Sequence, residues 1–184
     1  QEAGCARRRP FGLGGEITLF RYLQETEGQR TDLLLVRADE EEARLAQVEA
    51  LISAGRDVYL TRPLAGLPER YSLSSAGPLI AVHRTLATGP PPDLRSLGAA
   101  FGDEAVLLGI APLAPVVSGK SLRVVLYWRA GAPGGDRMVF VHVLDSGGNL
   151  VAQLDQRPVR GSYPTTHWRQ GEVIADAYDV PLPI

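Results

Sequence analysis

The chain has 184 residues, of which 45% are hydrophobic and 22% charged, and its formal net charge is −2 at pH 7. This composition is typical of a soluble globular protein and excludes a disordered or fibrous chain. The near balance of 19 basic and 21 acidic residues argues against a nucleic-acid partner, which would need a basic surplus. The longest apolar stretch, residues 105–117, contains two prolines and is shorter than the roughly 18 to 20 residues that cross a bilayer.

The first 15 residues carry three consecutive arginines, Arg7 to Arg9, and several glycines without an apolar period. We predict a flexible leader over residues 1–15, because a charged terminus without an apolar face rarely packs. From Glu16 onward the apolar residues recur at helical spacing, and Gly28 is a natural C-terminal stop. The sequence therefore predicts a helix over residues 16–27.

A βαβ unit is predicted next. Residues 32–37 form a continuous apolar run, which is typical of a strand buried on both faces of a parallel sheet. Asp39 is a suitable N-cap for a second helix, which carries an apolar stripe and is closed by Gly55. Residues 57–61 predict the second strand of the unit, joined to the first by a right-handed crossover. A further strand is predicted over residues 79–83.

The chain is expected to have two parts. Residues 16–88 are assigned to a small α/β unit, and residues 89–104 to a Pro-rich linker that contains the stiff run Gly89-Pro-Pro-Pro92. Beyond it every periodic segment predicts a strand, and turns recur at regular intervals. The predicted fold class is therefore α+β, in which the α/β unit is followed by an antiparallel β-sandwich over residues 105–184, of jelly-roll or immunoglobulin-like type.

Five strands are predicted in the sandwich. Residues 105–110 and 122–128 form the first two, and the second has one strongly apolar face. Residues 138–145 and 149–156 flank Ser-Gly-Gly and predict a hairpin. Residues 172–180 predict the last strand.

Because a stiff linker separates the two parts, each is expected to have its own hydrophobic core. Leu34, Val48 and Leu60 are predicted in the first core, and Leu126, Val141 and Leu154 in the second.

The sequence predicts neither a cofactor nor a metal. Residues 12–15 are glycine-rich but lack the Lys-Ser/Thr ending of a phosphate-binding loop. His83, His142 and His167 are too far apart to hold a metal from one element. We expect His142 to be a hydrogen-bonded structural histidine on the same strand face as Phe140 and Leu144.

Four carboxylates in the predicted sandwich have two interpretations. They could converge into a catalytic pair or a calcium site, or they could be solvated residues at hairpin ends and strand edges. A cleft with two carboxylates roughly 5 to 9 Å apart would indicate a glycan hydrolase. These residues are Asp145, Asp155, Asp176 and Glu172.

The turn-rich segment of residues 161–171 contains the candidate ligand-binding residues Tyr163, His167, Trp168 and Arg169. Its aromatic rings could stack on one face of a sugar while the neighbouring side chains donate hydrogen bonds. The segment could equally fold back to cap the sandwich and bury the indole. We favour the cap, for which Trp168→Ala should lower stability by roughly 3 kcal/mol or more.

Two stretches carry a recognisable pattern of aromatic, glycine and proline residues. The first comprises Thr18-Leu-Phe-Arg-Tyr-Leu-Gln24 with Glu27-Gly28, Arg30 and Asp32, then Ala54-Gly-Arg-Asp-Val-Tyr-Leu-Thr-Arg-Pro63 and Gly77-Pro78-Leu79. The second comprises Phe101-Gly102, Leu107-Leu-Gly109, Leu126-Tyr-Trp128, Val139-Phe-Val-His-Val-Leu-Asp145, Tyr163-Pro-Thr165, Trp168, Gly171-Glu-Val173 and Pro181-Leu-Pro183. Over residues 16–183 the chain resembles the C-terminal soluble region of bacterial polytopic membrane proteins that are similar to protein O-mannosyltransferase-like glycosyltransferases.

This resemblance implies an extracytoplasmic location, with the chain tethered to the cell membrane by a membrane-embedded part of the same polypeptide. In the resembled proteins the catalytic acidic residues lie in that membrane part, so no catalytic residue is expected here. The resemblance also implies a strand before the first helix, which is not legible in residues 1–15. Because the chain begins at Gln1 rather than methionine, we expect a piece of a longer protein.

The expected function is that of a non-catalytic accessory domain that positions a glycan or a protein acceptor. The alternatives are a carboxylate-dependent glycan hydrolase and a purely structural or oligomerising domain.

Overall fold

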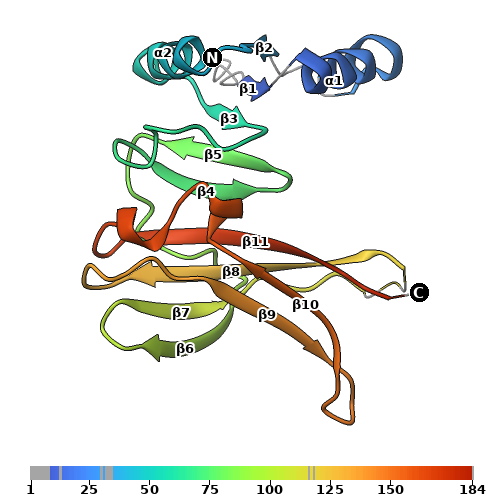
Figure 1. Ribbon diagram of the computed structural model, residues 1–184, viewed down its shortest axis with the longest axis vertical. Helices are drawn as coiled ribbons and strands as arrows, with labels where there is room; N and C mark the ends of the chain where they lie inside the picture. Colours follow the sequence, from blue (N-terminus) through green and yellow to red (C-terminus); the bar gives the residue numbers. More distant parts are fainter. Residues whose placement is uncertain are drawn as a thin grey trace. The chain divides into compact units, whose positions relative to one another are not determined.

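The chain forms two compact units, Gln1–Thr85 and Leu86–Ile184, and each is described by itself (Figure 1). The fold is α+β, as predicted: most of its sheet pairing is antiparallel, and two α-helices occur among the described residues. The computed structural model describes residues 9–12, 14–29, 31, 35–115, 117 and 119–183.

The first unit contains a five-stranded sheet of order β2-β1-β3-β5-β4. Strand β1 pairs in parallel with β2 and with β3, whereas β5 pairs antiparallel with β3 and β4. The strands are β1 (Arg9–Gly12), β2 (Val36–Arg37), β3 (Val58–Leu60), β4 (Ser72–Ala76) and β5 (Leu79–His83).

Strand β1 corrects the prediction of a flexible leader over residues 1–15. It lies between β2 and β3, so these two strands are not neighbours as the simple βαβ unit required. The sequence pattern does not predict this strand because Pro10 and Gly12 are unfavourable in a strand interior and leave no alternation of apolar residues. Within the predicted strand of residues 32–37, the structure places only Val36 and Arg37 in β2; Leu34 lies outside the described residues.

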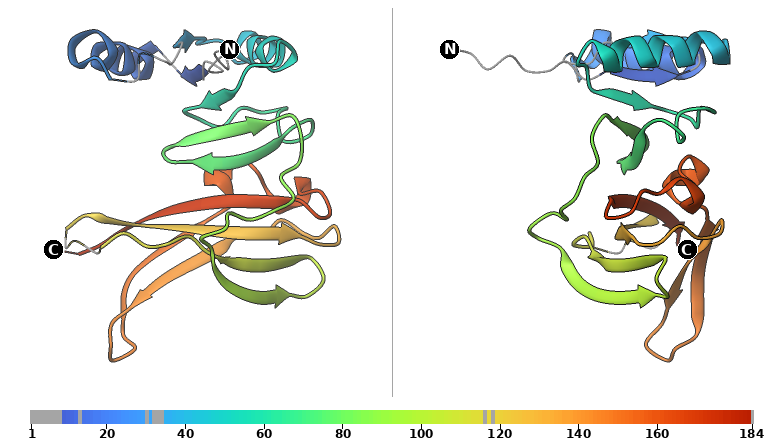
Figure 2. Two further views of the ribbon diagram at one scale, coloured as in Figure 1. Left: turned by 180° about the vertical axis from the view of Figure 1, so that it is seen from behind. Right: turned by 90° about the vertical axis from the view of Figure 1, so that its left-hand side faces the viewer.

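Helices α1 (Gly14–Glu27) and α2 (Glu41–Ser53) lie on opposite sides of β1 and β2 (Figures 1 and 2). Both predicted C-terminal stops are confirmed. Gly28 and Gly55 adopt φ angles of +62° and +78°, in the left-handed region that glycine tolerates.

The predicted N-cap of α2 is wrong. Glu40 occupies that position without a side-chain hydrogen bond to the helix. Asp39 instead accepts a hydrogen bond of 2.7 Å from Arg37 Nε. Val48 and Leu60 are buried in this unit, as predicted.

The second unit contains a four-stranded antiparallel sheet of order β11-β8-β7-β6 and a separate hairpin of β9 and β10. The turn of the hairpin diverges from the four-stranded sheet (Figures 1 and 2). The elements are β6 (Arg95–Phe101), β7 (Ala105–Ile110), β8 (Ser121–Ala130), β9 (Val139–Leu144), β10 (Leu150–Gln156), the 3-10 helices η1 (Val159–Gly161) and η2 (Thr165–His167), and β11 (Val173–Pro181).

The predicted hairpin and the strand over residues 105–110 are confirmed. The linker predicted over residues 89–104 is too long, because β6 lies within it. The register between β6 and β7 shifts between Ser96 and Ala99, and Gly98 in this irregularity has a φ of +67°. Every residue of β6 is exposed, so the strand carries no buried face that an alternation pattern could reveal.

The core of the second unit is smaller than predicted. Leu126 is buried, but Val141 and Leu154 are only half-buried. The physical reason is an open space between the hairpin and the four-stranded sheet, which is the candidate site.

Candidate functional site: an open cleft in the β-sandwich

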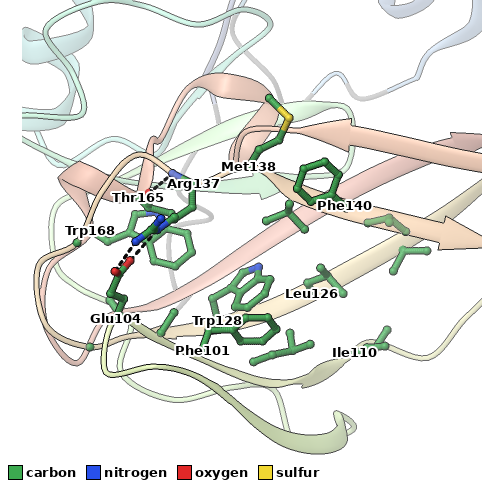
Figure 3. A pocket seen from close by; sticks show the side chains of 18 of the residues that line it. Phe101, Glu104, Ile110, Leu126, Trp128, Arg137, Met138, Phe140, Thr165 and Trp168 are labelled. Carbon is green, nitrogen blue, oxygen red and sulfur yellow. Dashed lines mark hydrogen bonds and ion pairs between the residues drawn. The ribbon is translucent and has the colours of Figure 1, made fainter.

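A cleft of about 1010 Å³ lies between the inner face of the four-stranded sheet and strand β9. Alternate residues of β8 point into it because successive side chains of a strand face opposite sides of the sheet. Leu126 and Trp128 from β8 form one wall with Phe101 from β6, while Met138 and Phe140 stand on the hairpin side (Figure 3). From Leu122 to Ala130, β8 borders the cleft over about 26 Å, so the site is elongated.

The cleft is open because the two sheets differ in width. Facing sheets of a β-sandwich pack about 10 Å apart and fill the space with side chains from both. Here four strands face two, and β10 packs beside β11. The side chains of β6 and β7 that line the cleft, Phe101, Leu107 and Ile110, are exposed or half-buried, so no layer covers them fully.

Three aromatic rings lie together at one end of the cleft. Phe101 and Trp128 meet edge to face with their centroids 5.4 Å apart, and Trp168 tilts against Trp128 at 6.2 Å. Contacts of this kind add about 0.5–1.5 kcal/mol beyond area burial, so they hold the wall in a defined shape.

The same end of the cleft carries its charged residues (Figure 3). Glu104 accepts two hydrogen bonds from the guanidinium of Arg137, 2.9 Å from Nε and 2.5 Å from Nη2. These bonds lower the pKa of Glu104. Thr165 Oγ1 accepts a 2.8 Å hydrogen bond from the Arg137 backbone N–H. A Cβ atom on Gly134 would lie 2.2 Å from Glu104 Oε2, so only glycine allows the carboxylate to take this place.

The buried carboxylate of Asp176 connects β11 to the turn that precedes the residues lining the cleft. Asp176 is fully buried on β11 and accepts hydrogen bonds from the hydroxyl of Tyr178 and from the Val159 backbone N–H at 2.8 Å. The indole Nε1 of Trp128 also faces this carboxylate, although its geometry falls outside a standard hydrogen bond. Burial raises the pKa of Asp176 to about 6, against the opposing effect of these donors.

The bond from Val159 to Asp176 holds a strained turn. Val159 and Arg160 have φ angles of +52° and +58°, in the left-handed region that costs a β-branched residue roughly 1–3 kcal/mol. Val159 is fully buried, and Arg160 donates a 2.7 Å hydrogen bond to Asp179. Packing and these hydrogen bonds therefore stabilise η1, which connects β10 to the segment containing Thr165 and Trp168 of the cleft.

The predicted ligand-binding residues have different roles. Tyr163 is fully buried and donates a 2.9 Å hydrogen bond to Glu172 Oε2, so it cannot form a platform for a ligand. Trp168 is half-buried, lines the cleft, and donates a 3.1 Å hydrogen bond from Nε1 to the Tyr163 carbonyl. His167 and Arg169 are half-buried and do not line the cleft. The segment thus closes the end of the sandwich and presents one aromatic ring to the cleft.

None of the four candidate carboxylates lines the cleft. Glu172 and Asp176 are fully buried, and Asp155 is exposed. Asp145 closes the turn of the hairpin, where hydrogen bonds from Asn149 lower its pKa. The paired arrangement that would indicate hydrolysis is not formed by these residues in the cleft.

The three histidines lie on different elements. His83 on β5 is hydrogen-bonded to Ser74 Oγ at 2.6 Å, and His167 belongs to η2. His142 shares an exposed face of β9 with Phe140 and Leu144, as predicted, but it is exposed rather than buried among partners. Among the described residues, no group of three or more His, Cys, Asp or Glu is placed to hold a metal.

Sequence reasoning missed most of the cleft. Phe101, Glu104 and Arg137 lie in segments whose apolar residues follow neither a helical nor a strand period. They meet only through the pairing of β6 with β7 and the loop before β9. One feature of the sequence did indicate the site. Residues 139–144 are apolar on both faces apart from His142, whereas a strand with one solvated face needs apolar residues on only one face.

Comparison with protein-family models, curated proteins and solved structures finds no match to this chain. In the part of the chain that the structure describes, no helix is both long and apolar enough to cross a membrane.

Proposed function

We propose that this chain is a non-catalytic accessory part of a glycosyltransferase-like protein, and that its second unit holds an acceptor in the cleft between β8 and β9. The observation that carries the proposal is the cleft itself. A concave, mostly apolar site with a few polar groups at one end is the usual form of a ligand-binding site. The extracytoplasmic location and the tether to a membrane-embedded part of the same polypeptide rest on the resemblance of residues 16–183.

The lining of the cleft favours an apolar acceptor over a glycan. Apart from the two indoles, the polar side chains that line it are Glu104, Arg137, Thr165 and His142. The first three hydrogen-bond to one another at one end. A glycan would need hydrogen-bonding partners along its length, whereas an apolar segment of a protein acceptor needs only apolar walls. A protein acceptor is therefore the version of the proposal that we retain.

Tryptophan fluorescence tests binding in the cleft directly. The chain contains two tryptophans, Trp128 and Trp168, and both line the cleft. We expect anilinonaphthalene sulfonate, an apolar fluorescent probe, to bind the full chain and to quench both indoles by energy transfer. A mannose oligosaccharide should cause no change; if the oligosaccharide quenches the indoles instead, the glycan acceptor replaces the protein acceptor.

A matched pair of variants separates the cleft from the rest of the surface. Leu107 and Leu108 are adjacent, half-buried residues of β7, and only Leu107 lines the cleft. Leu107→Gln should weaken probe binding at least roughly tenfold, because it places an amide in the apolar wall. Leu108→Gln should leave the affinity unchanged. Equal affinities of the two variants would contradict the proposed site.

A further inference from the structure

Strand β9 has one edge that is paired with β10 and one edge that faces the opening of the cleft. We propose that an extended segment of a partner polypeptide adds a strand to this free edge and thereby completes the sandwich. The inference rests on the proposed function, that the cleft is a binding site, and it specifies the shape and chemistry of the occupant.

The backbone of β9 supplies the first argument. The Asp145 N–H donates a 2.9 Å hydrogen bond to the Asn149 carbonyl, so Asp145 faces the β10 side of the hairpin. Because the backbone groups of a strand alternate between its two edges, Val143 and Val141 also face β10, and Phe140 and His142 face the free edge. No strand of the described residues pairs with that edge. An added strand would satisfy these N–H and C=O groups, which a lipid chain would not.

The opposing wall supplies the second argument. Because β10 packs beside β11, a strand added to the other edge of β9 would lie toward β7 and β6, whose side chains in the cleft are exposed or half-buried. Its inward side chains would contact Leu107, Ile110 and Phe101, all of which line the cleft. The single charged pair of the lining, Glu104 with Arg137, lies at one end. The occupant should therefore be a segment of about six residues, the length of β9, with an uncharged apolar side chain at every second position.

The size of the exposed patch argues against a second folded copy of this chain. Phe101 and Phe140 are 54% and 62% exposed, which amounts to about 200 Å² of aromatic surface, and Leu113 and Met138 add a comparable area. A stable interface between two folded proteins buries about 800 Å² on each partner. The patch supplies about half of this. A single strand can still bind there because its backbone hydrogen bonds add to the side-chain contacts.

The first test varies the peptide. The probe is a ten-residue peptide with four valines alternating with threonines and a lysine at each end; the control peptide has the same composition, reordered so that the valines follow a helical period. Binding to the full chain is measured by tryptophan fluorescence and by hydrogen exchange of β9. We expect the alternating peptide to bind at least about tenfold more tightly and to slow the exchange of Phe140 and His142. Equal affinities would overturn the inference.

N-methylation of the peptide tests the hydrogen bonds themselves. Methyl groups on every second nitrogen block only one edge of the peptide strand. One of the two possible methylation patterns should abolish binding and the other should preserve it. Equal effects of both patterns would overturn strand pairing even if the peptide occupies the cleft.

A pair of variants makes the same test on the protein. His142→Pro removes the N–H on the free edge and keeps the pairing with β10, whereas His142→Thr keeps that N–H and removes the imidazole. Only His142→Pro should fail to bind the alternating peptide, while both variants should still bind anilinonaphthalene sulfonate. If wild type binds the probe but not the peptide, the strand inference fails and the proposed cleft stands. If it binds neither, the proposed function fails. A concentration-dependent dimer that shields β9 would overturn the inference in favour of a second copy.

Discussion

In the second unit, the inner face of the four-stranded sheet is closed near its β11 edge and open near its β6 edge, and these two regions, the closed side and the open side, are built differently. On the β11 side, Ile174, Tyr178 and Val180 are fully buried, and the carboxylate of Asp176 has its hydrogen bonds satisfied. On the open side, Phe101 of β6 is more than half exposed, and so is Phe140 of β9, which also lines the cleft. The closed side therefore supplies the stability of the unit, and the open side keeps apolar surface accessible at the expense of burial.

This contrast indicates that the open cleft is a defined feature of the fold and does not result from poor packing of the whole unit. Polar groups next to the cleft are engaged: Tyr163 with Glu172, Thr165 with Arg137 and Gly135, and Arg137 with Glu104. The apolar surface between these groups is not covered. An exposed apolar surface next to side chains that hydrogen bonds hold in place is suited to binding, because the shape of the site exists before the ligand arrives.

The largest expected effect compares one aromatic residue from each side. Tyr163→Ala should lower the free energy of unfolding by about 4 kcal/mol, because it opens a cavity and leaves the buried Glu172 without its hydroxyl donor. Phe140→Ala should change it by less than about 0.5 kcal/mol, because the ring is 62% exposed. Urea unfolding of both variants measures the difference. Similar losses would mean that the open side is packed in solution.

Trp168 lies where the two sides meet and should show an intermediate effect. Its ring is half-buried, packs against Trp128 and donates to the Tyr163 carbonyl. We expect Trp168→Ala to lower stability by about 2 kcal/mol, less than a fully buried cap would, and to weaken binding of anilinonaphthalene sulfonate as well. Trp168→Phe should recover part of both losses. A variant that loses stability alone would place the residue entirely on the closed side.

The buried Asp176 should give the closed side an unusual pH dependence. Its folded-state pKa is raised to about 6 from an ordinary value of 3.8, so between these values the folded protein binds more protons than the unfolded chain. Its contribution to stability therefore grows as the pH falls through 6, by about 1.3 kcal/mol from pH 7 to pH 5.

Asp176→Asn isolates this contribution from that of other titrating groups. The difference between wild type and the variant in urea unfolding should follow the folded-state pKa, and the variant should lack the gain at pH 5. The neighbouring Tyr178, whose pKa is itself raised by burial and by Asp176, stays protonated throughout this range. A difference that does not change between pH 5 and pH 7 would contradict the assignment.

These differences explain which features the sequence could predict. Strands whose burial alternates could be predicted: β8 and the two strands of the hairpin matched their predicted ranges closely. Strand β6 was predicted as part of the linker because exposed residues show no apolar period. Strand β1 was predicted as part of the flexible leader because a four-residue strand with Pro10 depends on its two neighbours for pairing. The cleft was missed for a related reason. Its charged end joins Glu104 and Arg137, 33 residues apart, through tertiary contact alone.

The smallest effect on stability is expected at this charged end. Glu104 and Arg137 form an exposed ion pair, so Glu104→Gln should leave the midpoint of thermal unfolding unchanged. Binding should respond differently, because the variant leaves the guanidinium of Arg137 without its carboxylate beside the aromatic cluster. The affinity for the anionic probe anilinonaphthalene sulfonate should rise roughly twofold to fivefold at low salt, and the gain should disappear at high salt. The double variant Glu104→Gln with Arg137→Gln should return the affinity to the wild-type value. A gain that survives the loss of Arg137 would mean that the probe does not reach the charged end of the cleft.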